Sequence, residues 1–291
     1  MNLNKILAAT LVLSIGALTV TNLRKTRTTD QELAETTAKI TNFAGNSGGT
    51  GVVLESGPTA SYVLTNAHVC GVVKYGGLVT TDAKQASVTS YKLSEIHDLC
   101  LITTNVDLGI NTEVATDAPS VYSAAIVSGH PALLPTIITR GMFSGKEIID
   151  IFTGMRECTE QDHENGLGMI CAFLGGFPVI RTYQSQVISA TIQPGSSGSA
   201  VFNEKGQISG LVFAGSGALS YGHIVPLEYV NNFLDNELTT LKDQRPLDDS
   251  VRKVMQTPET KLKTTCKETS SLEYEIVKDF CKYVNKDAIY E

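Results

Sequence analysis

The strongest constraint on the fold is a series of short β-branched runs between about residues 50 and 225, each bounded by Gly, Ser, Asn or Pro. Short strands at even spacing with turn signals between them are typical of all-β barrels and sandwiches. No long helical pattern alternates with the runs, which argues against a doubly wound parallel sheet. The predicted strands cover Gly51–Leu54, Tyr62–Thr65, Leu99–Thr103, Ala124–Ser128, Thr136–Thr139, Gln186–Thr191, Ala200–Asn203, Ile208–Phe213 and His223–Val225.

Two helices are predicted after this region. Apolar residues at helical spacing follow Pro226, a residue well suited to open a helix. A second short helix is expected near the C-terminus. The two apolar sets are Leu227, Val230, Phe233, Leu234 and Leu238, then Leu272, Ile276, Phe280 and Tyr283.

Composition excludes several classes of protein. Of the 291 residues, 42% are hydrophobic and 18% are charged, which is too apolar and too weakly charged for a disordered chain. No stretch after residue 23 approaches the roughly 18 apolar residues of a membrane span, so a polytopic membrane protein is excluded. The net charge of −7 argues against nucleic acid as a partner, because phosphate binding needs a basic face.

The first 23 residues have the pattern of an export signal. Ile6–Val20 is apolar or hydroxylated throughout, with Lys5 before it and Arg24 and Lys25 soon after it. This pattern predicts a signal peptide or an uncleaved signal anchor over residues 1–23. A buried N-terminal helix is the alternative.

The cysteine content is compatible with an oxidising compartment. An even number of cysteines permits a full set of disulfides, and buried free thiols are the alternative. Cys158 and Cys171 flank a Gly-rich polar segment, an arrangement typical of the two sides of a hairpin. The six candidates are Cys70, Cys100, Cys158, Cys171, Cys266 and Cys281.

Three local patterns together suggest acyl transfer to a hydroxyl. They are a β-run that ends in Ala67-His68, an apolar strand that opens at Asp98, and the loop Gln193–Phe202. Such chemistry requires a base, an acid that orients the base, and paired backbone N–H groups facing the developing oxyanion. A Gly-x-Ser-Gly run can aim N–H groups into one small concavity, and the candidate donors are Gly195 and Ser197.

The chain resembles the trypsin-like serine proteases of the chymotrypsin clan, and most of all the HtrA/Deg type of protease domain. The resemblance covers roughly residues 45–238. The motifs that carry it occur in the family's order: Thr65–Val69, His97–Ile102, Ser128–Pro131, Thr139–Gly145, Gln193–Val201 and Tyr221–Pro226.

The resemblance implies two six-stranded antiparallel β-barrels with a C-terminal helix and a short charged tail. By motif position His68 is the general base, Asp98 its orienting partner and Ser197 the nucleophile, with no cofactor and no metal. Ser196 and Ser199 compete less well for the nucleophile, since neither holds the Ser position of the Gly-x-Ser-Gly frame. The expected divisions are the leader at 1–23, a protease domain at 36–238, and a charged tail at 239–291 that is partly helical and disulfide-tied.

Three other histidines are assigned no catalytic role. His97 is expected to be a neighbouring strand residue, His130 a structural residue in a Gly-His-Pro turn, and His163 a solvated residue in a hydrophilic loop. The surrounding stretch Glu157–Met169 resembles an insertion, which is expected to form a surface hairpin rather than a substrate-facing flap.

The resemblance also bears on the cysteines and on activation. Cys70 and Cys100 each follow their triad residue by two positions, so a disulfide between them is expected if both segments are extended. Ser196 stands where digestive relatives carry the Asp that binds a newly freed N-terminus. Activation by a salt bridge between a freed N-terminus and residue 196 is therefore not expected. The 53 residues after Leu238 leave no room for a PDZ-like module.

The specificity pocket can be placed only by motif offset. Its base is expected near Thr191, and its walls are expected to comprise Phe213, Ala214, Gly215, Gly222 and His223. Gly215 and Gly222 leave room for a small or medium apolar side chain. His223 supports a preference for acidic residues as a minor alternative.

The function predicted is that of an exported serine endopeptidase acting on protein or peptide substrates, with contact to a membrane only through an N-terminal anchor. A catalytically silent protease-like binding protein is the first alternative. An esterase using the same residues is the second.

Overall fold

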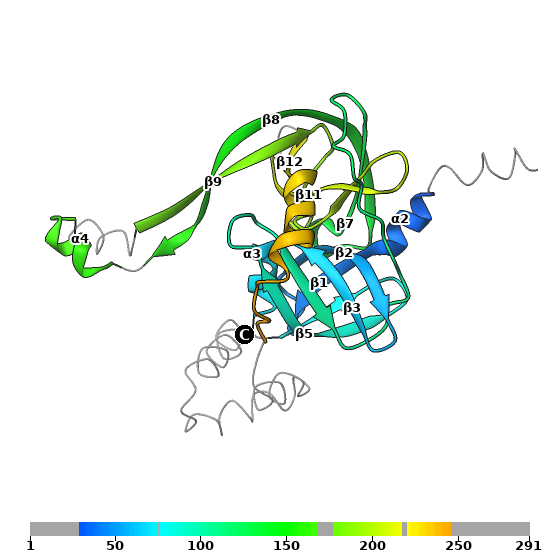
Figure 1. Cartoon of the computed structure of the whole chain (residues 1–291), viewed down its shortest axis with the longest axis horizontal. Helices are drawn as coiled ribbons and strands as arrows, with labels where there is room; N and C mark the ends of the chain where they lie inside the picture. The colour runs from blue at the N-terminus through cyan, green and yellow to red at the C-terminus, as the bar shows by residue number, and fades with distance from the viewer. Residues whose placement is uncertain (1–28, 75, 157, 168–176, 217–219, 246–291) are drawn as a thin grey trace, which may run out of the picture.

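The computed structural model describes residues 29–74, 76–156, 158–167, 177–216 and 220–245, and these form two closed antiparallel barrels of six strands each (Figure 1). The first barrel has the order β1-β2-β3-β6-β5-β4. Its strands are β1 (Thr37–Asn42), β2 (Gly48–Gly57), β3 (Ala60–Thr65), β4 (Gly77–Thr80), β5 (Gln85–Leu93) and β6 (Cys100–Thr104).

The second barrel has the order β10-β11-β12-β9-β8-β7. Its strands are β7 (Ala124–Gly129), β8 (Ile137–Arg156), β9 (Phe177–Ile188), β10 (Ala200–Phe202), β11 (Ile208–Ser216) and β12 (Tyr221–Pro226). The predicted fold of two six-stranded antiparallel barrels is confirmed.

Helices are short and lie at the ends and connections of the barrels. The predicted C-terminal helix is present and begins directly after Pro226, whose fixed φ suits the start of a helix. The second predicted helix and the leader lie outside the described residues. The helices are α2 (Asp30–Thr36), α3 (Ala67–Val72), the 3-10 turn η1 (Pro131–Leu133), α4 (Glu160–Glu164), α6 (Leu227–Asn232) and the π turn η2 (Phe233–Glu237).

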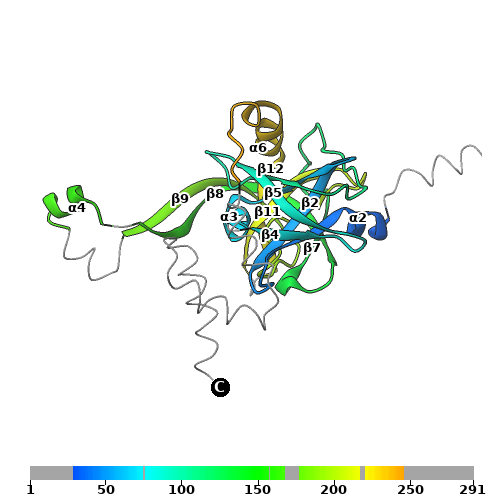
Figure 2. The same cartoon turned by 90° about the horizontal axis from the view of Figure 1, so that it is seen from below.

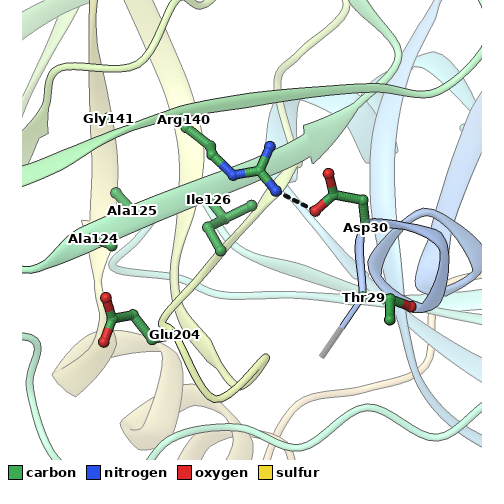
Figure 3. A pocket seen from close by; sticks show the side chains of 8 residues that line it. All are labelled: Thr29, Asp30, Ala124, Ala125, Ile126, Arg140, Gly141 and Glu204. Carbon is green, nitrogen blue, oxygen red and sulfur yellow. Dashed lines mark hydrogen bonds and ion pairs between the residues drawn. The ribbon is translucent and has the colours of Figure 1, made fainter. Parts of the chain in front are cut away.

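α2 begins with a capping box, although no helix was predicted here from the sequence. The Thr29 hydroxyl accepts from the Glu32 N–H, and the Glu32 carboxylate accepts from the Thr29 N–H. Leu33 is buried on the inner face of the helix. Asp30 pairs with Arg140 of β8 beside a cavity of about 360 Å³ (Figure 3). α2 is thereby attached to the second barrel immediately before the chain enters the first.

One apolar cluster joins the two barrels. It contains residues from β2, β3 and β6 of the first barrel and from β9 to β12 of the second, together with α2, α6 and η2. Each barrel also has one apolar cluster of its own in its interior. The largest fully buried side chains of the shared cluster are Phe202, Phe233, Leu33, Leu64 and Leu99.

β8 and β9 continue beyond the second barrel as a two-stranded arm. β7 covers β8 only to Met142 and β12 covers β9 only from Gln186, while β8 and β9 pair on to Arg156 and Phe177. Figures 1 and 2 show this arm reaching away from the barrels with α4 at its far end. The predicted insertion lies at this tip, and its described residues are 158–167. None of the helices in the described ranges has the length and apolar character that crossing a bilayer requires.

Candidate active site

His68 lies in the first turn of α3, immediately after β3. β3 ends at Thr65, and α3 begins at Ala67. Between them Asn66 is the N-cap of α3, and its backbone is still extended. The Asn66 side-chain amide donates to the Asp98 carbonyl oxygen at 2.9 Å. This bond joins the His68 segment to the Asp98 segment by a buried side chain.

Asp98 binds His68 through both carboxylate oxygens. Oδ2 lies 2.6 Å from His68 Nδ1, and Oδ1 accepts from the His68 backbone N–H at 3.0 Å. The Asp98 side chain is 11% exposed and the His68 side chain 50% exposed. Because the carboxylate accepts from Nδ1, the proton of a neutral imidazole is held there, and Nε2 is left with its lone pair.

A tyrosine from the second barrel lies near the same carboxylate. Burial raises the pKa of Tyr183, and the negative charge of Asp98 raises it further, while Arg181 opposes both. The Tyr183 ring packs edge-on against Phe213, with ring centroids 5.7 Å apart. No local motif marks Tyr183, so the sequence did not predict it as a neighbour of the candidate site.

The predicted disulfide between Cys70 and Cys100 is present, with Cα atoms 6.4 Å apart. The assumption behind that prediction is only half right, because Cys70 lies in α3 and only Cys100 lies in a strand. The bond ties the helix carrying His68 to the strand that follows Asp98. Cys158 is also disulfide-bonded, and Cys171, Cys266 and Cys281 lie outside the described residues.

The loop predicted to carry the nucleophile (Gln193–Phe202, here called the nucleophile loop) contains a tight turn with two glycines at positive φ. Gly195 has φ +92° and Gly198 has φ +85°, a region that side chains other than glycine enter at a cost. A Cβ on Gly195 would lie 2.6 Å from the His130 carbonyl oxygen, and one on Gly198 would lie 1.9 Å from the Thr50 carbonyl oxygen. Neither position can hold a larger residue without movement of the backbone.

Two amides of this loop, those of Gly195 and Ser197, have no acceptor among the described residues. The Pro194 carbonyl accepts from the Ala132 N–H at 2.6 Å, and the Ser196 carbonyl accepts from the Ser199 N–H at 2.9 Å. In a trans peptide the N–H points opposite to the C=O, so the Gly195 and Ser197 N–H groups point away from these contacts. Among the described residues neither N–H has an internal acceptor. Both residues are half-buried, and their N–H groups can bind an oxyanion.

Thr50 of the first barrel holds this loop of the second barrel. Its N–H donates to the Ser197 carbonyl at 2.8 Å, and its hydroxyl donates to the Gly195 carbonyl at 2.8 Å. The same hydroxyl accepts from the His130 N–H at 2.9 Å. A residue of the buried strand β2, outside every motif that pointed to the site, therefore sets the orientation of the loop.

The His68 segment and the nucleophile loop meet over Gly49. A Cβ on Gly49 would lie 2.7 Å from Val69 Cγ2 and 3.0 Å from the Ser197 carbonyl oxygen. The residue after His68 and the main chain of Ser197 therefore both approach the face of Gly49 where any other residue would carry a side chain. The structure brings all three motifs to the junction between the barrels.

Two other histidines singled out by sequence have side chains engaged in contacts of their own. The His97 ring stacks on Tyr229, with centroids 4.0 Å apart, and burial lowers its pKa against the opposing charge of Glu237. His130 is buried, and its Nδ1 bonds the Leu134 carbonyl at 2.9 Å. His130 has the structural setting that the sequence predicted. His97 was predicted to lie in a strand, but it lies in the bend between β5 and β6, where its N–H and that of Ile96 bind the Ser94 hydroxyl.

The predicted pocket residues divide between two faces of the sheet. Gly215 of β11 and Gly222 of β12 pair directly. Neighbouring residues of a strand face opposite sides, so His223 faces away from Gly222. The His223 ring lies 6.4 Å from Phe213 and its Nδ1 contacts Ser185 Oγ at 3.0 Å and Glu147 Oε1 at 3.2 Å. Thr191 is exposed and Ala214 half-buried.

Comparison with solved structures supports the fold. The structure is similar to the active form of the Rv3671c protease from M. tuberculosis, with a TM-score of 0.55 and 18% identity over 74% of this chain and 85% of that chain. It is also similar to the serine endoprotease from Yersinia pestis, with a TM-score of 0.51 and 16% identity over 73% of this chain and 67% of that chain. At such identities the likeness concerns the fold alone.

Comparison with sequence families supports the class of enzyme. No curated protein matches the sequence as a relative. The model of the trypsin-like peptidase domain matches residues 49–211, which is more than half of the chain and includes the three motifs. This chain therefore belongs to the trypsin-like peptidase family, as a serine-type peptidase that acts on protein or peptide substrates.

Proposed function

We propose that this protein is an exported serine endopeptidase that cleaves peptide bonds through an acyl-enzyme, with His68, Asp98 and Ser197 as its triad. The observation that carries the proposal is the contact of 2.6 Å between His68 Nδ1 and Asp98 Oδ2, which leaves Nε2 as the basic atom of the ring. It is supported by the approach of Val69, the residue after His68, and of the Ser197 carbonyl to the same face of Gly49.

In the proposed reaction Ser197 Oγ attacks the scissile carbonyl carbon while His68 Nε2 takes the hydroxyl proton. Asp98 stabilises the imidazolium that forms. The Gly195 and Ser197 N–H groups stabilise the oxyanion of the tetrahedral intermediate, and His68 then protonates the leaving amine. Water, deprotonated by His68, attacks the resulting ester and releases the carboxylic acid product with Ser197 restored.

The proposed enzyme does not depend on a salt bridge between a freed N-terminus and residue 196, because residue 196 is a serine. The Ser196 N–H bonds the Gln193 carbonyl at 2.9 Å, and the loop is held from outside by Thr50 and Ala132. These contacts can maintain the loop in the absence of a carboxylate at position 196. We expect activity without N-terminal trimming, and activity that appears only after trimming would contradict this part.

The remaining elements of the proposal concern location and chain organisation. Residues 1–23 are proposed to export the chain or anchor it, 36–238 to form the protease domain, and 239–291 a charged tail. The Cys70–Cys100 disulfide supports an oxidising compartment. Cell fractionation of the full chain beside a variant lacking residues 2–23 tests export, and equal retention inside the cell would contradict it.

A fluorophosphonate probe tests the catalytic assignment. We expect labelling of the full chain, loss of labelling in Ser197→Ala and His68→Ala, and persistent labelling in Ser196→Ala. Labelling that survives in Ser197→Ala would remove the nucleophile assignment. No labelling in any form would favour a silent binding protein, and labelling without cleavage of a peptide library would favour an esterase.

A further inference from the structure

The space between the two paired glycines of β11 and β12 is occupied by one side chain. A Cβ on Gly215 would lie 2.6 Å from Ile192 Cγ2 and 2.7 Å from Ile192 Cβ. A Cβ on Gly222 would lie 2.4 Å from Ile192 Cγ1. The room that these glycines provide is therefore filled by the isoleucine itself.

Ile192 is held firmly in this position. Its side chain is only 4% exposed and belongs to the apolar cluster inside the second barrel, together with Ile188 and Ile224. Ile188 closes the same space from the side, since its Cγ1 would lie 3.4 Å from a Cβ on Gly222. Close packing on several sides leaves the isoleucine little freedom to swing away.

The filled space is adjacent to the nucleophile. Ile192 immediately precedes the turn in which the Gln193 carbonyl accepts from the Ser196 N–H. On the other side, the Gly198 N–H donates to the Val212 carbonyl at 2.8 Å, and Gly215 follows Val212 by three residues along β11. The isoleucine and the glycine pair therefore flank the backbone of the loop that carries Ser197.

We propose that Ile192 is the residue that sets the specificity of this site, by limiting the substrate residue before the scissile bond (P1) to small uncharged side chains such as those of Gly, Ala and Ser. This inference rests on the proposed function. A longer P1 side chain would have to occupy the volume of the isoleucine. Ile192 is packed with the buried apolar residues of this cluster, and placing a charged P1 group among them would cost its hydration.

The minor alternative of an acidic P1 residue finds no support in this arrangement. His223, the one titratable candidate, faces the opposite side of β12 from Gly222. Its Nδ1 is engaged by Ser185 and Glu147, and the nearby Glu147 carboxylate would repel an acidic side chain. Size rather than charge is therefore the expected basis of selection.

The test is a change of P1 preference in Ile192→Ala. A peptide series that differs only in P1 (Ala, Val, Leu or Phe) is used to measure kcat/KM in the wild type and the variant. We expect the Leu-to-Ala ratio of kcat/KM to rise by about tenfold or more, the range that single methylene differences produce in apolar pockets. Ile192→Val, the conservative change, serves if the alanine variant does not fold, and its expected shift is smaller in the same direction.

Two matched variants distinguish an effect on the P1 pocket from a general loss of packing in the second barrel. Ile224→Ala removes the same atoms from the same cluster and is expected to leave the P1 ratio unchanged, because Ile224 contacts the space beside Gly210 rather than the glycine pair. Adding Gly222→Ala to Ile192→Ala returns a methyl group to the vacated space. This double variant is expected to return the ratio toward the wild-type value.

A binding measurement keeps the test independent of catalysis. The same peptides are titrated into Ser197→Ala with and without Ile192→Ala, and the Leu-to-Ala ratio of Kd values is expected to change in the same sense. If the probe labels nothing but this ratio changes, the proposed catalytic function is overturned and the role of Ile192 is supported. An unchanged ratio in both measurements, or a change equal to that of Ile224→Ala, overturns the role of Ile192.

Discussion

Thr50 connects the two barrels through its side-chain hydroxyl and its backbone amide. The hydroxyl lies between the Gly195 carbonyl and the His130 N–H, and the amide binds the Ser197 carbonyl. Thr50 is fully buried and does not reach substrate. It is a positioning residue, because the loop that it holds is the one that carries the proposed nucleophile and oxyanion donors.

Thr50→Val is expected to lower kcat by about tenfold with little change in KM. This is less than the roughly 10²–10³-fold loss from deleting an oxyanion donor, because the valine displaces the donors without removing them. Thr50→Ser retains the hydroxyl and is expected to restore kcat. Steady-state kinetics of the three proteins check this, and a serine variant as impaired as the valine variant would show that only packing matters.

His130 gives the fold a sensitivity to acid. Burial lowers the pKa of His130, with Lys39 adding to the decrease and the Leu134 carbonyl and Asp82 opposing it. The unfolded chain, with its ordinary histidine pKa of about 6.5, then binds more protons than the folded one below that pH, so stability must fall as pH falls. His97 acts with the same sign, since burial also lowers its pKa.

We therefore expect the free energy of unfolding to be constant above about pH 7 and to decrease as the pH falls below about 6.5. His130→Gln should flatten this decrease and leave the remainder to His97. Urea unfolding at half-unit steps from pH 7.5 to about 5.5, above the range in which carboxylates titrate, measures the slope. An equal slope in both proteins would contradict the assignment.

Between elements, the strongest local tie is the disulfide that joins α3 to β6. It links residues 30 apart in the chain, and closing a loop of that length in the unfolded state is worth roughly 3 kcal/mol. Cys70 and Cys100 are fully buried, so alanine fits the site better than serine. Because α3 carries His68 and β6 follows Asp98, the bond also supports the contact between these two side chains.

The double variant Cys70→Ala/Cys100→Ala is expected to lose about 3 kcal/mol of unfolding free energy, measured in urea, and to show reduced kcat. Cys158→Ala is the control, because Cys158 is also disulfide-bonded but lies between the end of β8 and the start of α4, at the tip of the arm. It should leave kcat unchanged. A kcat loss of the same size in both variants would show that the effect is not specific to the α3–β6 tie.

In the whole molecule, the two barrels share one apolar cluster and are expected to unfold together. Phe202 of β10 is fully buried in this cluster with residues of both barrels. Separate unfolding would expose the cluster on each barrel and lose its burial energy. The junction that this cluster supports is also the place where the three motifs meet.

Phe202→Ala is expected to destabilise the protein by about 3–5 kcal/mol. Amide exchange of β4 and β5 in the first barrel should increase as much as that of β11 and β12 in the second. The control is Ile148→Ala on the arm, whose side chain is 73% exposed and should contribute little. Increased exchange confined to the second barrel would contradict cooperative unfolding of the pair.

The strands that the sequence predicted are those with continuous apolar runs, such as β3 and β6. β1, β4 and β5 were missed, since Thr, Lys, Ser and Gln interrupt their apolar positions and each depends on its neighbours in the barrel for pairing. α2 was missed although Thr29 and Glu32 form a readable capping pattern, because its only buried side chain is Leu33. Such a short helix needs the tertiary contacts of Leu33 and Asp30.

The sequence by itself determined an all-β fold of short strands and the tight glycine turn around Ser197, because strand runs and glycine turns are encoded by residues next to one another. The arrangement in two barrels and the pairing of His68 with Asp98 were implied by the resemblance of the motifs to a known family, and the structure has both. Only the tertiary structure decided that Thr50 holds the nucleophile loop, that Tyr183 lies near Asp98 and that Ile192 fills the space left by Gly215 and Gly222. These are contacts between segments far apart in the chain. Their partners are selected by how the barrels close and pack, and no local pattern records that choice.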